Sequence, residues 1–193
     1  FGYGQYGQMA ANNQTTYSSP RQIPGTYWSN KISSSNYGGG GVKTDGTLWM
    51  WGYNQFGQVG DGQTTDVLSP VSISGTQWSS VSCGYRNTYA LKTDGTLWAW
   101  GGGASGQLGQ GDAISRSSPV QLPGTQWTHV RGGEYCGFAR KDDGSIWGFG
   151  RNSKGELGVN DDVQHASPIQ VPGTWSAFQG YGRLGKGQTL LFK

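Results

Sequence analysis

The residues that could carry chemistry in this 193-residue chain do not form a catalytic motif. Its two histidines, His129 and His165, stand at different positions of the repeat described below. The sequence has no Gly-x-Ser-x-Gly elbow, no His-Glu-x-x-His helix and no Walker-type phosphate loop. The glycine run at 38–41 is not followed by a lysine with serine or threonine, as a P-loop requires. We therefore expect a protein that is not an enzyme and binds no cofactor.

The aspartates fall into two groups, and neither predicts a metal site. Those of the first group each precede a glycine between two extended segments: Asp45, Asp94 and Asp143. An Asp-Gly pair favours a tight hairpin turn, which explains these carboxylates without a ligand. Those of the second group lie in long glycine-rich loops: Asp61, Asp112, Asp161 and Asp162. Their spacing is not that of an EF-hand, so we predict no metal.

Three further properties of the sequence bear on its possible partners: the cysteines, the charge and the hydropathy. Cys83 and Cys136 differ in repeat position and belong to no C-x-x-C motif, so they form either one bridge or two free buried thiols. The net charge is +3, and the basic residues are scattered instead of forming the stripe typical of nucleic-acid binding. No apolar run approaches the length of a membrane span. We expect neither a nucleic-acid partner nor membrane insertion.

A unit of 49 or 50 residues occurs four times and makes the chain a single repeat domain, 1–193. The units are 1–50, 51–99, 100–148 and 149–193. Lys-Thr-Asp-Gly-Thr-Leu-Trp occurs at 43–49 and 92–98, and Lys-Asp-Asp-Gly-Ser-Ile-Trp at 141–147. A proline and then a tryptophan recur in every unit: Pro20, Pro70, Pro119 and Pro168, with Trp28, Trp78, Trp127 and Trp175. Such a period predicts stacked supersecondary units that share one core.

The pattern within one unit predicts four short strands. In the second unit these are 69–73, 78–82, 88–92 and 96–100, with Asp94-Gly95 turning the last hairpin. Four-stranded units with recurring glycine and aromatic residues are typical of β-propeller blades. We expect three tryptophans to stack between blades (Trp49, Trp98 and Trp147) and three side chains to hydrogen-bond their own loop: Gln58, Gln107 and Glu156.

The full motif resembles the repeat of the regulator-of-chromosome-condensation family. It reads Asp-Gly-Thr-Leu-Trp-x-Trp-Gly-x-Asn-x-x-Gly-Gln-x-Gly, then a proline, then Trp-x-x-Val-x-x-Gly, and it covers essentially the whole chain. The resemblance implies a propeller of about seven blades with one blade per repeat. We therefore predict an all-β, propeller-type array of four four-stranded blades.

The ends of the sequence do not close this array. In register, Phe1 stands where Trp51 and Trp100 stand, and Lys193 where Lys92 and Lys141 stand. The segment Thr-Asp-Gly-Thr-Leu-Trp-x is therefore missing between them, and the unit 149–193 lacks its final strand. We favour an arc of a larger propeller, with further blades from the same longer chain. Completion by another subunit and a closed four-bladed monomer are the alternatives.

The loop positions that vary between units are the candidate binding residues. They carry aromatic rings, which give contact area, beside polar groups that give direction. They are Tyr3, Tyr6, Tyr53, Asn54, Phe56, Tyr85, Arg86, Tyr135, Asn152, Tyr181 and Arg183. We expect them to bind a protein or glycan surface, the alternative being that the aromatic rings only pack between blades.

These features predict a non-catalytic structural and recognition module. The high content of Gly, Ser, Thr, Asn and Gln and the charged fraction of 13% favour part of an extracellular adhesin or of a virion tail or surface protein, outside cells or on a virion. A propeller-type inhibitor of a secreted enzyme is the alternative. The resemblance also implies an exchange factor for a small GTPase, but that role needs a full ring and insertions that this sequence does not show.

Overall fold

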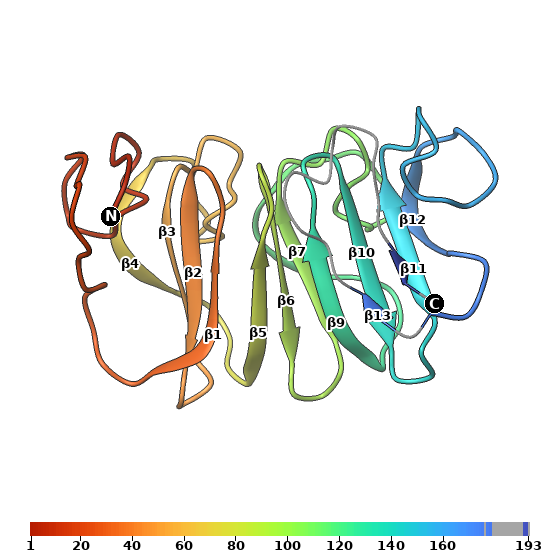
Figure 1. Ribbon diagram of the computed structural model, residues 1–193, viewed down its shortest axis with the longest axis horizontal. Coiled ribbons are helices and arrows are strands. Elements are labelled where there is room, and N and C mark those ends of the chain that lie inside the picture. Colours follow the sequence, from red (N-terminus) through yellow and green to blue (C-terminus); the bar gives the residue numbers. More distant parts are fainter. Residues whose placement is uncertain (176, 179–190, 193) are drawn as a thin grey trace.

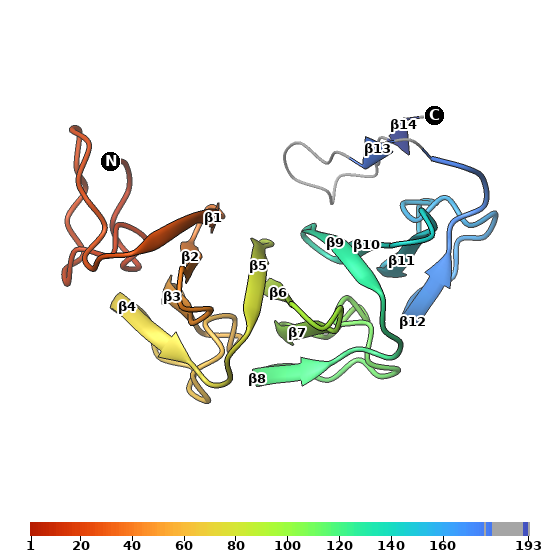
Figure 2. The ribbon, with the colours of Figure 1, turned by 90° about the horizontal axis from the view of Figure 1, so that it is seen from below.

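The computed structural model describes residues 1–175, 177–178 and 191–192 and forms an open arc of β-sheets (Figures 1 and 2). Three four-stranded antiparallel sheets, here called blades 1 to 3, stand side by side, and a two-stranded ribbon follows them. This part of the chain contains no helix. The all-β, propeller-type array predicted from the repeats is confirmed. Among the described residues it consists of three complete blades and the ribbon.

Each blade is a meander of four strands in chain order. Blade 1 contains β1 (Trp28–Ser34), β2 (Gly38–Lys43), β3 (Leu48–Gly52) and β4 (Val67–Ile73). Blade 2 contains β5 (Trp78–Cys83), β6 (Asn87–Lys92), β7 (Leu97–Gly101) and β8 (Arg116–Gln121). Blade 3 contains β9 (Trp127–Gly132), β10 (Cys136–Lys141), β11 (Ile146–Gly150) and β12 (His165–Gln170). The ribbon pairs β13 (Ala177–Phe178) with β14 (Leu191–Phe192). Figure 2 shows β1, β5 and β9 on the concave side of the arc and β4, β8 and β12 on the outside.

The blades are offset from the repeats of the sequence. The unit 51–99 contains β4, which pairs with β3 of blade 1, and also β5, β6 and most of β7, which belong to blade 2. Each blade therefore takes its outer strand from the repeat that follows the one supplying its inner strands. Neighbouring blades are joined by this shared repeat as well as by packing.

The N-terminal segment has the form of the outer part of a further blade. Gly2 forms an antiparallel bridge with Tyr17, as Gly52 does with Val67 in blade 1. The Trp51 indole N–H donates to the Gln8 carbonyl over 3.2 Å, and in the next blade the Trp100 indole donates to the Gln58 carbonyl over 3.0 Å. The segment thus covers blade 1 as the loop of blade 1 covers blade 2, which is the arrangement expected of an arc.

The centre of the layer between blades is formed by residues other than the three tryptophans expected there. Trp100 and Phe149 are fully buried between adjacent blades, whereas Trp98 and Trp147 are only partly buried and pack at the edge of this layer. Trp98 and Trp100 are two apart on β7 and therefore share a face of the sheet, so their different positions along the strand decide how deeply each is buried. A Cβ on Gly60, whose φ is +89°, would lie 2.5 Å from the Trp100 ring nitrogen. The glycine is therefore needed for this packing.

Both cysteines are free. Cys136 is buried, and Cys83 is partly exposed, with its thiol directed at the Ser33 carbonyl over 3.7 Å. Burial raises the pKa of each thiol to about 12. Of the two alternatives left open by the sequence, the structure shows two protonated thiols without a bridge.

Candidate functional site

The two ends of the blades carry different structures. Because the strands are antiparallel, the Asp-Gly hairpins all lie at one end, which we call the hairpin end. The long loops 53–66, 102–115 and 151–164 and the short turns before β2, β6 and β10 lie at the opposite end, the loop end (Figure 1). The candidate binding residues belong to the loop end.

Each long loop is held by the same hydrogen bond. Gln58 Oε1 accepts from the Phe56 N–H over 3.0 Å, and Gln107 Oε1 accepts from the Ser105 N–H over 2.8 Å. In blade 3, Glu156 Oε2 accepts from the Lys154 N–H over 2.7 Å. The predicted role of these three side chains is confirmed. The loops therefore share one backbone shape, on which different side chains are displayed.

Five aromatic rings gather at the loop end of blades 1 and 2. With Arg86, they form what we call the aromatic cluster: Tyr6, Tyr37, Tyr53, Phe56 and Tyr85. Tyr6 lies 5.6 Å from Tyr37 and 5.1 Å from Tyr53, measured between ring centroids. Tyr37 lies 5.5 Å from Tyr53 and 5.1 Å from Tyr85, and Tyr53 lies 6.2 Å from Phe56. These spacings are those of favourable aromatic pairs.

Arg86 closes one side of the aromatic cluster. Its guanidinium carbon lies 4.5 Å from the Phe56 centroid and 5.4 Å from the Tyr85 centroid, within range of a cation–π interaction. The hydroxyl oxygens of Tyr37 and Tyr85 lie 3.3 Å apart, and the Tyr53 hydroxyl donates to Gln55 Oε1. Partial burial raises the pKa of Tyr53. All six side chains are half-buried, so rings and polar groups alike are held in place and still reach solvent.

The structure brings together Tyr6, Tyr53, Phe56, Tyr85 and Arg86 from the predicted set and adds Tyr37, which the sequence reasoning missed. Tyr37 comes directly before β2, as Arg86 comes directly before β6. The glycine run of β2 lacks the side chains that mark the matching strands of the other units, which hides the register. Aligning Gly38 with Asn87, the first residues of the two strands, would have revealed Tyr37.

The other predicted residues lie elsewhere. Tyr3 is 58% exposed outside the aromatic cluster, and its hydroxyl donates to Gln5. Tyr135 belongs to blade 3, where Arg151 stacks on its ring with 4.5 Å from the guanidinium carbon to the centroid. Tyr181 and Arg183 lie outside the described residues.

Asn54 and Asn152 are not surface residues, contrary to the prediction. Both are fully buried. The Asn54 amide donates to Asp61 and to the Gln63 carbonyl, and its oxygen accepts from the Val59 N–H over 2.8 Å. Asn152 makes the matching bonds in blade 3 with Asp161 and Leu157. The two amides satisfy the buried polar groups of their loops, and burial removes them from contact with a partner.

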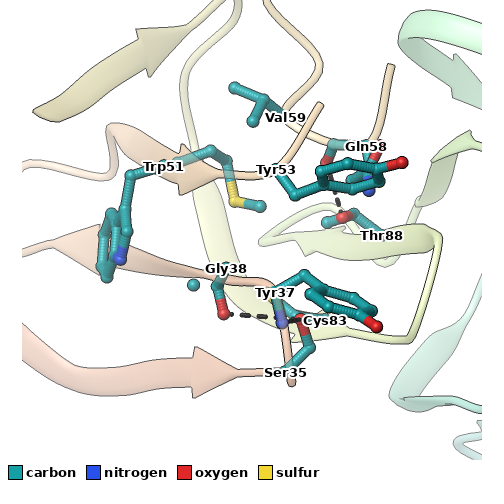
Figure 3. A pocket seen from close by; sticks show the side chains of 11 residues that line it. Ser35, Tyr37, Gly38, Trp51, Tyr53, Gln58, Val59, Cys83 and Thr88 are labelled. Carbon is teal, nitrogen blue, oxygen red and sulfur yellow. Dashed lines mark hydrogen bonds between the residues drawn. The ribbon is translucent and has the colours of Figure 1, made fainter. Parts of the chain in front are cut away.

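A narrow pocket opens below the aromatic cluster, between blades 1 and 2 (Figure 3). Tyr37 and Tyr53 line it together with Gln58 and Thr88. The Gln58 carbonyl accepts from the Thr88 hydroxyl over 2.7 Å. Gln58 is 8% exposed, and its Nε2 has no acceptor within the described part of the chain. The pocket therefore combines aromatic walls with one unmatched hydrogen-bond donor.

Nothing in the described ranges resembles a metal centre or a membrane anchor. Their His, Cys, Asp and Glu side chains form no group of three or more that could hold a metal ion. The described part of the chain also has no helix long and apolar enough to cross a membrane. The carboxylate of Asp161 pairs with His165 Nε2 over 3.1 Å, and this hydrogen bond is the main cause that lowers the pKa of Asp161.

Comparison with known proteins agrees with this geometry. The model of the regulator of chromosome condensation (RCC1) repeat matches residues 45–91, 94–140 and 143–176, and a second model of the same repeat matches 78–107. The chain belongs to the RCC1 repeat family. The match covers Tyr53, Phe56, Tyr85 and Arg86, whereas Tyr6 and Tyr37 lie before its first residue.

Solved structures show the same fold. Human WBSCR16 superposes with a TM-score of 0.81 at 23% identity, over 92% of this chain and 49% of that protein. Prp20p of Saccharomyces cerevisiae, described with its binding to Gsp1p and histones, superposes with 0.77 at 19% identity, over 89% and 46%. Yeast RCC1 (Prp20) bound to Kap60 superposes with 0.73 at 19% identity, over 89% and 44%. This RCC1-repeat chain spans about half the length of these proteins. A search of curated proteins found no match.

Proposed function

We propose that this chain is a non-catalytic recognition module that binds the surface of another protein through its aromatic cluster. One observation carries the proposal. Side chains from three separate stretches, near residues 6, 37 and 85, join Tyr53 and Phe56 in one half-buried patch at the loop end. Tyrosine and arginine are the side chains most enriched among residues that dominate binding energy. The rigid blades beneath them keep the loss of conformational entropy on binding small.

The relatives support a protein partner. Prp20p is described with its binding to Gsp1p and histones, and yeast RCC1 is seen bound to Kap60. Those partners belong to those proteins. What we carry over to this chain is the use of a repeat propeller as a protein-binding scaffold. A glycan is the second candidate ligand, since half-buried tyrosine faces beside the Arg86 guanidinium also suit a sugar.

We also propose where the module acts: outside cells or on a virion. A charged fraction of 13% and 36 glycines in 193 residues favour part of an extracellular adhesin or of a virion tail or surface protein. An inhibitor of a secreted enzyme uses the same cluster differently, by inserting aromatic side chains into the cleft of one enzyme. The two proposals differ in the target that the protein captures.

The experiment compares the protein with three variants on isolated cell envelopes, a glycan array and a panel of secreted proteases and glycosidases. Tyr53→Ser and Tyr85→Ser each remove one ring of the aromatic cluster. Tyr27→Ser is the matched control, because Tyr27 is 78% exposed and lies outside the cluster. We expect the two cluster variants to bind at least about 30-fold more weakly, as for loss of a residue worth 2 kcal/mol or more.

Each outcome separates the candidates. Binding to envelopes supports the adhesin or virion proposal, sugars on the array identify a glycan, and nanomolar capture of one enzyme supports the inhibitor. In every case the Tyr27→Ser variant should bind as the unmodified protein does. If the cluster variants also keep full affinity for the captured target, the aromatic cluster is not the binding site.

A further inference from the structure

A group of basic side chains lies on one face of blade 3. Val130 of β9 packs into the hydrophobic cluster shared with blade 2. Its neighbours His129 and Arg131 therefore point to the opposite face of the sheet, since side chains alternate along a strand. Arg140 of β10 pairs directly with His129, and residues directly opposite each other share a face. We call His129, Arg131 and Arg140 the cationic cluster.

Blade 2 shows which residues stand at these positions where a further four-stranded blade packs on the face. The pair Ser80–Leu91 of blade 2 has the same register as the pair His129–Arg140 of blade 3. Leu91 is 3% exposed and lies in the core between blades 2 and 3. At the third position, Ser82 stands for Arg131, and its hydroxyl accepts from the Gly132 N–H over 3.0 Å. Blade 3 thus replaces two serines and a core leucine with three basic residues.

Among the residues that the structure describes, no negative group balances these charges. Within residues 1–175, no ion pair involves His129, Arg131 or Arg140. Arg140 Nε is buried and has no hydrogen-bond acceptor. Residues 163–193 contain no Asp or Glu, so the following segment supplies no carboxylate side chain. A buried guanidinium N–H without an acceptor is unfavourable, and so are like charges on neighbouring strands.

The pKa of His129 reflects its partial burial and the positive charges around it. Partial burial lowers the pKa of His129, and the positive charges of Arg140, Arg131 and Lys31 lower it further. Lys31 belongs to β1, so the positive field at this face has a contribution from the concave side of blade 1. The cationic cluster thus forms an electropositive part of this face, next to the apolar cluster that contains Phe138 and Ile146. Figure 2 shows blade 3 between blade 2 and the β13–β14 ribbon.

We propose that the cationic cluster binds a phosphate or sulfate group. Guanidinium donors bind such oxyanions with charge-assisted, often bidentate hydrogen bonds. Several positive groups on one face match a tetrahedral dianion better than a single carboxylate. The anion would supply the acceptor that Arg140 Nε lacks. The site is independent of the aromatic cluster, since it lies on the sheet and not at the loop end.

The test uses the residues that blade 2 carries at the same positions. NMR of the full chain follows the arginine Nε–Hε and His129 ring signals during titration with inorganic phosphate, inorganic sulfate or acetate at constant ionic strength. We expect saturable shifts with phosphate or sulfate. Binding should be at least 10-fold weaker in Arg140→Leu and absent in the triple variant His129→Ser, Arg131→Ser, Arg140→Leu. The control Lys154→Ser removes one exposed charge of blade 3 outside the cluster and should bind as before.

A second titration, with a sulfated oligosaccharide and with a phosphorylated sugar, tests whether the oxyanion is a free ion or part of a larger molecule. Tighter binding of one of them than of its inorganic ion identifies the carrier, and equal binding indicates the free ion. The Arg140→Leu variant restores the apolar side chain of blade 2, so it should fold and melt no lower than the unmodified protein. Unsaturable shifts, equal binding of acetate, or equal weakening in Lys154→Ser and Arg140→Leu would each overturn the proposal.

Discussion

The hairpin end and the loop end of the blades are built from the same repeats, but the hairpin end repeats its lysine and tryptophans, whereas the loop end varies its surface side chains. In blades 2 and 3, a lysine ammonium lies over two tryptophan rings: Lys92 at 4.9 Å from Trp78 and 4.5 Å from Trp98, and Lys141 at 4.9 Å from both Trp127 and Trp147. Blade 1 has the same arrangement with Lys43, Trp28 and Trp49.

At the loop end the matching positions change from blade to blade. The pair just before the second strand and just after the third is Tyr37 and Tyr53 in blade 1, Arg86 and Gly102 in blade 2, and Tyr135 and Arg151 in blade 3. The backbone of the long loops is nevertheless held in the same way in all three. The repeat therefore maintains the scaffold at both ends, while the loop-end side chains that reach the surface differ from blade to blade.

Truncating a buried tryptophan at the hairpin end should have the largest effect on stability. Trp78 is 2% exposed and contacts Trp98, Trp100 and the Lys92 ammonium. Trp78→Ala should lower the free energy of unfolding by about 3–5 kcal/mol, because it leaves a cavity. Chemical denaturation measures this. Tyr85→Ser at the loop end should lose clearly less, and equal losses would contradict the division between the two ends.

Asn54 lies at the loop end but belongs to the scaffold. Asn54→Ala leaves the Val59 N–H without its acceptor in a buried site. We expect a loss of about 1–3 kcal/mol in the free energy of unfolding. Gln55→Ala, at the exposed neighbouring position, is the control and should change stability little. Loss of stability in both variants alike would show that position in the loop, and not burial, decides the effect.

The lysine between two tryptophans should contribute a smaller amount. Lys92→Gln removes the cation and keeps part of the aliphatic chain, so we expect about 1 kcal/mol of destabilisation, whereas Lys92→Arg should keep most of the interaction. Thermal unfolding of the two variants checks this. If the Lys92→Gln and Lys92→Arg variants melt at the same temperature, the cation between the two tryptophans does not stabilise the protein.

The smallest effect should be the acid dependence of the hairpins. A hydrogen bond from the Thr or Ser hydroxyl two residues on is the main cause that lowers the pKa of Asp45, Asp94 and Asp143 below 3.8. Their stabilising contribution is therefore complete above the unfolded pKa and is lost as the pH falls through the lower folded values. The melting temperature, measured between pH 6 and pH 2.5, should fall less steeply below pH 4 in a variant with all three aspartates changed to Asn than in the unmodified protein. An unchanged slope would exclude these turns as its source.

The scaffold could be predicted from the sequence because its signals are local and repeated. The Asp-Gly turns, the loop glycines and the Gln58-type bond each depend on residues a few positions apart, and four copies fix the register. The aromatic cluster depends on contacts between units, such as Tyr6 with Tyr37, which spacing alone does not show.

Two kinds of residue escaped the sequence reasoning. Asn54 and Asn152 looked like surface polar residues because the motif does not say which way a loop side chain points. The repeated lysines of the hairpin end were not among the residues expected to interact, yet strand pairing places Lys92 opposite Trp78. In both cases the missing information is the direction of a side chain in a folded neighbourhood.

The offset between repeats and blades has a mechanical consequence. A pulling force or a protease that frees one repeat, such as 51–99, removes the outer strand of one blade and inner strands of the next. No repeat can therefore detach along a sheet boundary, and damage to one unit breaks hydrogen-bonded ladders in two blades. Coupling between nearest neighbours of this kind makes a repeat array unravel in larger cooperative steps than its period implies. Under load, the arc should yield two blades at a time.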